Sequence, residues 1–151
     1  MALRQLRTFD DEILRKKSRK VEKMDDKIIM LLEDMADTMY AAENGGGLSA
    51  CQVGVLKRVV VIDIGDGLIE LINPEIVHQA GEQIVEEGCL SFPDVWGMVK
   101  RPSKITVRAL NREGKEIEIQ AKGLLAQCIS HEIDHLDGIV FTSKVIKYIT
   151  D

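Results

Sequence analysis

This sequence has few aromatic residues, few prolines and an odd number of cysteines. Its 151 residues include one tryptophan, two tyrosines, three phenylalanines, three prolines and three cysteines. Three cysteines cannot close a disulfide framework, so metal binding or plain burial of the thiols is expected in a reducing compartment. The net charge of −5 argues against a general binder of nucleic acids or anionic membranes.

Long apolar runs and a signal-peptide core are missing as well. No stretch approaches the roughly 18 apolar residues of a membrane-spanning helix, so we expect a cytoplasmic protein. A hydrophobic content of 45% and a charged content of 30% are ordinary for a soluble globular protein. Because the chain shows no repeat and no linker, residues 1–151 are expected to form a single domain.

The segment from Ser130 to His135 reads Ser-His-Glu-Ile-Asp-His. Residues four apart share one face of a helix, so His131 and His135 can bind one metal ion together. Glu132 lies about 100° from His131 around a helix of 3.6 residues per turn, so it flanks the ion without ligating it. This His-Glu-x-x-His arrangement predicts a metal site in which the glutamate acts on a metal-bound water.

Two histidines leave a catalytic metal site short of a third protein ligand. Cys89 follows a predicted strand within the sequence Glu-Glu-Gly-Cys-Leu-Ser, where a thiolate can point off the edge of a sheet. Cys128 is the rival, one helical turn before His131, but three ligands crowded on one helix would be strained. We therefore favour Cys89 as the ligand and interpret Cys128 as part of a pocket wall.

A third segment, Gly45-Gly46-Gly47 followed by Leu-Ser-Ala-Cys-Gln52, is rich in glycine. Glycines allow another backbone to approach closely, and a bare strand edge can accept an extended peptide. A phosphate-binding loop would need a Gly-Lys-Ser/Thr ending, which is missing. A helix stop followed by a turn remains the simpler interpretation. The neutral amide of Gln52 can donate a hydrogen bond to a developing oxyanion.

Hydrophobic periodicity predicts two helices and several short strands. A strongly amphipathic helix covers 25–43 and is stopped by Asn44 to Gly47. Asn73-Pro74 is expected to break the strand region that follows. The expected strands are 58–64, 68–72, 75–78, 83–86, 104–110 and 115–120, and the second helix is 124–137. The predicted class is α+β, with short antiparallel strands packed around a central, metal-binding C-terminal helix.

Taken together, the three segments resemble the peptide deformylases. The family pattern Gly-x-Gly-Leu-(Ala/Ser)-Ala-x-Gln fits 45–52, Glu-Gly-Cys-Leu-Ser fits 87–91, and His-Glu-x-Asp-His fits 131–135. The motifs occur in the family's order, and the resemblance covers nearly the whole chain. It implies a cytoplasmic hydrolase of protein biosynthesis that removes the formyl group from N-formylmethionyl nascent peptides and releases formate.

The resemblance also implies roles for individual residues. Cys89, His131 and His135 would hold one Fe²⁺ ion, and Zn²⁺, Ni²⁺ or Co²⁺ would also fit this thiolate and imidazole set. Glu132 would be the general acid and base, with Gln52 and the backbone N–H of Leu90 as oxyanion donors. The residues expected to bind substrate are Gly46, Gly47, Val85, Glu87, Gly88, Leu124, Gln127 and Cys128, and Arg101 would pair with Glu87.

The expected partners are nascent peptides at the ribosome. The protein is expected to be a monomer that binds neither membranes nor, directly, nucleic acid. Two departures from the family pattern stand out: Ser130 replaces a common Gln, and Trp96 occupies a position where some members carry Arg.

A zinc endopeptidase shares the His-Glu-x-x-His turn but would usually need a downstream His or Glu as third ligand, and only Asp137 and Asp151 follow His135 as carboxylates. A structural metal protein would close its site with four protein ligands.

Overall fold

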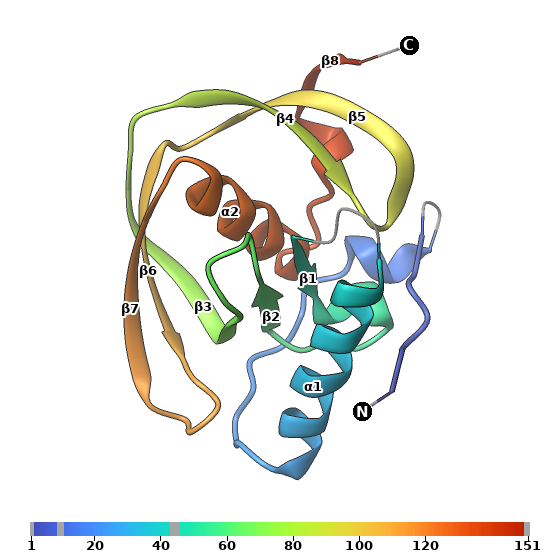
Figure 1. Ribbon diagram of the computed structural model, residues 1–151, viewed down its shortest axis with the longest axis vertical. Coiled ribbons are helices and arrows are strands. Elements are labelled where there is room, and N and C mark those ends of the chain that lie inside the picture. Colours follow the sequence, from blue (N-terminus) through green and yellow to red (C-terminus); the bar gives the residue numbers. More distant parts are fainter. Residues whose placement is uncertain (1, 9–10, 43–45, 150–151) are drawn as a thin grey trace.

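The computed structural model describes residues 2–8, 11–42 and 46–149. The described residues form two α-helices, α1 (Asp26–Ala41) and α2 (Leu124–Leu136), which lie among antiparallel strands (Figure 1). Short 3₁₀ helices are η1 (Glu12–Arg15), η2 (Ala50–Val53) and η3 (Phe141–Lys144). The strands are β1 (Gly47–Ser49), β2 (Val59–Ile62), β3 (Ile69–Ala80), β4 (Gln83–Cys89), β5 (Phe92–Arg101), β6 (Lys104–Leu110), β7 (Glu116–Lys122) and β8 (Val145–Tyr148).

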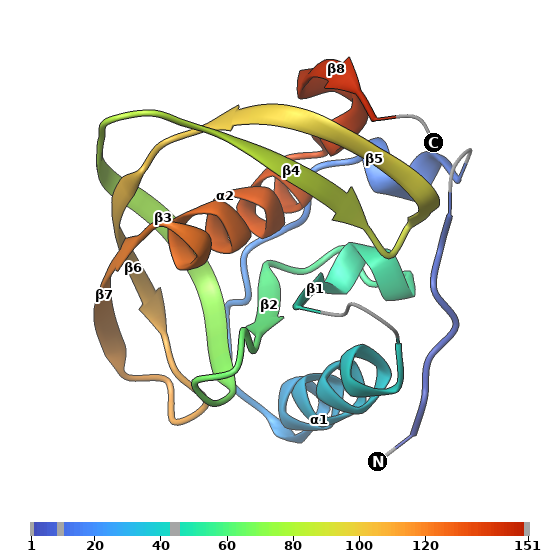
Figure 2. The same ribbon diagram turned by 45° about the horizontal axis from the view of Figure 1, so that its top comes forward.

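The strands form two sheets around α2. One sheet has the order β1-β2-β3-β6-β7 and the other β4-β5-β8, and every pairing is antiparallel. α2 contacts strands of both sheets, while α1 packs on β1 and β2 from the other side (Figure 2). The α+β class is therefore as predicted. Neither of the two α-helices in the described part of the chain is long and apolar enough to cross a membrane.

The N-terminal helix α1 forms where the periodicity places it. The side chain of Asp25 caps it by accepting a hydrogen bond of 3.0 Å from the N–H of Ile28. Its apolar face is buried, with Met35 and Met39 fully inaccessible, so the methionine stripe is core. The helix ends at Ala41, earlier than the predicted 43, and residues 44–45 of the predicted stop at 44–47 lie outside the described residues.

The predicted break at Asn73-Pro74 is wrong, because β3 continues through it as one strand of 12 residues. The pairing of β3 with β6 shifts register at this point, so the missing N–H of Pro74 falls in a bulge. Asn73 adopts a positive φ of 53°, and its amide exchanges two hydrogen bonds of 2.8 Å with the backbone of Val21. The side-chain bonds thus hold a conformation that the local sequence disfavours.

The second sheet contains more strand than we predicted. β4 extends to Cys89, and β5 and β8 lie in segments to which no strand was assigned. The β6–β7 hairpin and α2 match the prediction closely, and Gly138 follows α2 with a φ of 76°, a conformation that favours glycine. The long strands β3 and β5 also contradict the expectation that all strands are short.

Candidate metal centre

Three of the predicted site residues come from one buried turn of α2. His131, Glu132 and His135 are 6%, 5% and 0% exposed, so the motif faces the interior. The two imidazole rings meet edge to face with centroids 5.0 Å apart, which agrees with the four-residue spacing on one helix face. The helix therefore presents two nitrogen donors and one carboxyl group to the same space.

Cys89 brings a sulfur donor to these histidines from the end of β4. Its Sγ lies 3.2 Å from Nε2 of His135. The candidate ligand atoms of Cys89, His131 and His135 all lie within 4.8 Å of one another, a separation that one ion can bridge. Cys128 is not part of this cluster, and burial raises the pKa of its thiol to about 12.

This donor set fits a transition-metal ion. A thiolate with two imidazoles suits soft to borderline divalent ions, and three protein ligands leave a coordination position for water or substrate. A structural site would have four protein ligands, and the cluster formed by the described residues has three. The three donors therefore leave room for a further ligand on the ion.

A buried ion pair orients His131. Glu87 accepts hydrogen bonds from Arg101 at 2.6 and 2.8 Å and lies 2.6 Å from Nδ1 of His131. Burial alone would raise the pKa of Glu87, but the bonds from Arg101 and His131 outweigh it and lower the pKa to about 2. An ionised carboxylate can only accept, so Nδ1 of His131 donates and leaves Nε2 available for a metal.

Glu132 occupies a narrow space between α2 and β1. The hydroxyl of Ser49 lies 2.9 Å from its Oε1, and burial raises the pKa of the carboxyl group. Gly47 lies on the other side, where an added Cβ would stand 2.7 Å from Oε2 of Glu132 and would displace the carboxyl group. The carboxyl group is thus desolvated and held between two residues of one strand.

The amide of Gln52 is oriented by hydrogen bonds at both ends. Its Oε1 accepts from the N–H of Ser49 at 2.9 Å, and its Nε2 donates to the hydroxyl of Ser91 at 3.1 Å. The same Nε2 lies 3.5 Å from Sγ of Cys89, so the amide donor faces the metal centre. Leu90, whose N–H is the other predicted oxyanion donor, directly follows Cys89 in the chain and lines the adjoining cavity.

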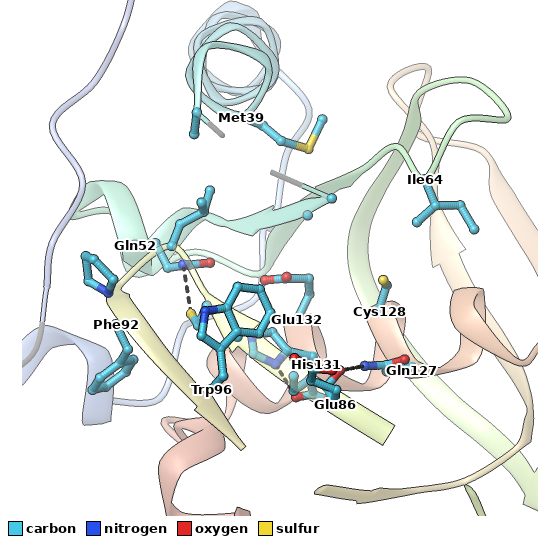
Figure 3. A pocket seen from close by; sticks show the side chains of 18 of the residues that line it. Met39, Gln52, Ile64, Glu86, Phe92, Trp96, Gln127, Cys128, His131 and Glu132 are labelled. Carbon is cyan, nitrogen blue, oxygen red and sulfur yellow. Dashed lines mark hydrogen bonds and ion pairs between the residues drawn. The ribbon is translucent and has the colours of Figure 1, made fainter. Parts of the chain in front are cut away.

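A cavity of about 830 Å³ opens beside these residues. Figure 3 shows Gln52 from η2 and Glu132 and His131 from α2 around it, with Gln127 and Cys128 one turn earlier on α2. Val85 does not line this cavity and pairs with Val99 instead. The predicted residues that do line it are Gly46, Gly47, Gln52, Glu87, Gly88, Cys89, Leu90, Leu124, Gln127, Cys128, His131 and Glu132.

Several contacts at the site were not anticipated from the sequence. Asp134 forms a second ion pair with Arg101, in addition to that of Glu87. Asp134 also binds Lys144 at 2.9 Å. An acidic residue inside a mostly buried helix was the sequence signal that could have predicted an ion pair for Asp134. Trp96 lies against Gly88, where an added Cβ would be 2.8 Å from the indole, so the ring forms part of the cavity wall.

Comparison with known proteins gives one consistent answer. The family model for polypeptide deformylases matches residues 3–149. The chain is 65% identical to the peptide deformylase of Acetivibrio thermocellus over 151 residues, all of this chain and 88% of that one. It is 60% identical to the peptide deformylase of Caldicellulosiruptor bescii, again over all of this chain and 90% of the relative.

Solved structures agree with this. The crystal structure of a peptide deformylase from Legionella pneumophila superposes with a TM-score of 0.92 at 47% identity, covering 95% of this chain and 86% of that one. The peptide deformylase from Ehrlichia chaffeensis in complex with actinonin gives 0.93 at 39% identity, covering 96% and 90%.

Proposed function

This chain belongs to the polypeptide deformylase family, and we propose that Cys89, His131 and His135 hold the metal ion with which it removes the N-terminal formyl group from nascent peptides. The observation that carries the ligand assignment is the meeting of the Cys89 sulfur with the two imidazoles of α2. The direct test is formate release from a formyl-Met peptide, compared with cleavage of an internal peptide bond. Internal cleavage without formate would instead indicate a zinc endopeptidase.

We propose Fe²⁺ as the natural ion, with Zn²⁺, Ni²⁺ and Co²⁺ as ions that the same ligands accept. When bound, such an ion polarises the carbonyl of the substrate and lowers the pKa of a bound water toward neutrality. Glu132 takes a proton from the attacking water and delivers it to the leaving amine. Its buried position favours this role, because burial raises the pKa of the carboxyl group toward the working range of a proton carrier.

Gln52 and the N–H of Leu90 are the proposed donors to the oxyanion formed at the formyl carbon. A preorganised donor stabilises charge that develops in the transition state without reorienting during the reaction. The two hydrogen bonds that fix the Gln52 amide provide that preorganisation. The products are formate and a peptide with a free amino terminus.

β1 offers the edge along which we propose the peptide binds. It is the terminal strand of its sheet, and the carbonyl of Gly46 accepts from the N–H of Asp63 on the β2 side. Antiparallel alternation then directs the N–H and C=O of Gly47 to the open edge. Gly88 lines the cavity as well. An extended peptide can therefore add to β1 as a further strand.

The methionine side chain is expected to enter the cavity beside Leu124, Gln127 and Cys128. Burying a side chain of this size contributes about 1.5–3 kcal/mol. Replacing the first residue of the substrate by alanine should lower kcat/KM by about one to two decades, measured as formate release from matched formyl peptides. An alanine substrate processed as fast as the methionine one would refute this pocket.

The iron form should be sensitive to oxidation. The cavity that reaches Cys89 is open to solvent, and a thiolate beside Fe²⁺ is readily attacked by oxygen or peroxide. We expect the activity of the iron protein to decay in air and the nickel or cobalt protein to keep its activity longer. Half-lives in aerated buffer measure this, and equal values for iron and nickel forms would count against it.

We further propose that residues 1–151 act as a single catalytic domain and as a monomer in the cytoplasm. The substrate class supports action in the cytoplasm, because formylated nascent chains emerge from ribosomes there. We also propose that the enzyme meets its substrate at the ribosome, through the peptide and without direct contact to nucleic acid. The excess of acidic residues supports that last point.

A further inference from the structure

Ser49 contacts the proposed base more closely than any role assigned so far requires. It is fully buried on β1, and its Oγ lies 2.9 Å from both Oε1 and the backbone carbonyl of Glu132. The other carboxyl oxygen of Glu132 packs against Gly47, two residues earlier on the same strand. The carboxyl group is therefore in contact with two residues of β1.

The alternation of β1 explains this arrangement. Side chains of residues two apart point to the same face of a strand, so positions 47 and 49 both face α2. Leu48 faces the opposite way and belongs to the core beneath α1. The absence of a side chain at Gly47 admits the carboxyl group, and the hydroxyl of Ser49 then fixes its rotation.

We propose that Ser49 is a positioning residue that holds Glu132 in its working rotamer through the hydroxyl. The inference rests on the proposed role of Glu132. The backbone N–H of the same residue also fixes Gln52, so one position on β1 aligns both the base and the amide donor. The peptide is expected to add to the open edge of this strand, which places substrate and base on the same support.

The test is kcat, KM and metal content of Ser49→Ala with a formyl-Met peptide. Loss of a supporting hydrogen bond around a metal site typically costs about 10–100-fold in activity. We expect kcat to fall about 10-fold with KM and metal content unchanged, because the backbone bond to Gln52 is retained. The matched control is Ser130→Ala, which removes another buried hydroxyl, one without a partner among the described residues, and it should keep the wild-type kcat.

A double-mutant cycle separates positioning of Glu132 from a general structural effect. In a Glu132→Ala background, adding Ser49→Ala should change the residual rate by less than about 2-fold, because no carboxyl group remains to be held. A further loss of about 10-fold in that background would overturn the proposal, as would a wild-type kcat in Ser49→Ala.

If Ser49→Ala does not fold, the near-isosteric Ser49→Cys replaces it, and its thiol, a weak donor, should give the same loss. Failure of the proposed function would be distinguishable, since the wild-type protein would then release no formate. With formate released by the wild type, a normal kcat in the Ser49 variants refutes the positioning role alone.

Discussion

Replacing Cys89 by alanine is expected to remove most of the bound metal. The thiolate is one of three protein donors, and the remaining imidazoles of His131 and His135 cannot complete a catalytic site. Loss of partners outside the ligand set already costs about 10–100-fold in metal affinity, so loss of a ligand should weaken binding by more than about 100-fold. Metal content per chain after dialysis, measured by atomic emission, checks this.

Cys128→Ala provides the matched control, because it removes another partly buried thiol that lines the same cavity. Its sulfur is outside the cluster of candidate ligands, and burial raises the pKa of this thiol to about 12, so it is not a thiolate near neutrality. We expect this variant to retain its metal. Full occupancy in Cys89→Ala, or loss of metal in Cys128→Ala, would overturn the ligand assignment.

The sequence predicts the centre of this site well because its information is local. His131, Glu132 and His135 lie within one and a half turns of a helix, so helical geometry alone determines which of them share a face. The assignment of Cys89 as a ligand needed more than local geometry, because Cys89 lies on β4 and the two histidines lie on α2. The requirement of the metal for a third ligand linked these two distant segments.

The residues that support the centre could not be read in the same way. Asp134 on α2 binds Arg101 of β5 and Lys144 of η3, and only the folded chain shows these two contacts. Ser49 has no sequence signal for its contact with Glu132, since the two residues are 83 positions apart. Val85 does not line the cavity, so its role in binding substrate, which the family resemblance implies, stays a prediction.

The strands that were missed contain residues which disfavour strands locally. β5 includes Pro93, Gly97 and Asp94, whose φ is 64°, so its pattern reads as a loop. Its pairing with β4 on one side and β8 on the other overrides those preferences. The same applies to β3, where a bulge accommodates Pro74. Tertiary pairing is the information that local propensity lacks.

Replacing Glu132 by glutamine is expected to have the largest effect on turnover. Glutamine is nearly isosteric, and its carbonyl oxygen can still accept from Ser49, so the fold and the three metal ligands should be preserved. It cannot accept the proton of the attacking water. General acid–base catalysis contributes about 10²–10⁴-fold, and the loss should lie near the upper end because one carboxyl group serves as both base and acid.

Glu132→Asp separates the need for a proton acceptor from the need for its exact position. Aspartate keeps a proton acceptor but withdraws it by one methylene group from Ser49 and Gly47, which hold the glutamate carboxyl. The expected order of activity is therefore Glu, then Asp, then Gln. The measurement is kcat/KM for formate release beside the metal content of each variant. A fully metallated Glu132→Gln protein with nearly wild-type kcat/KM would mean that another group moves the proton, and Glu132 would then be only a buried acid in the cavity wall.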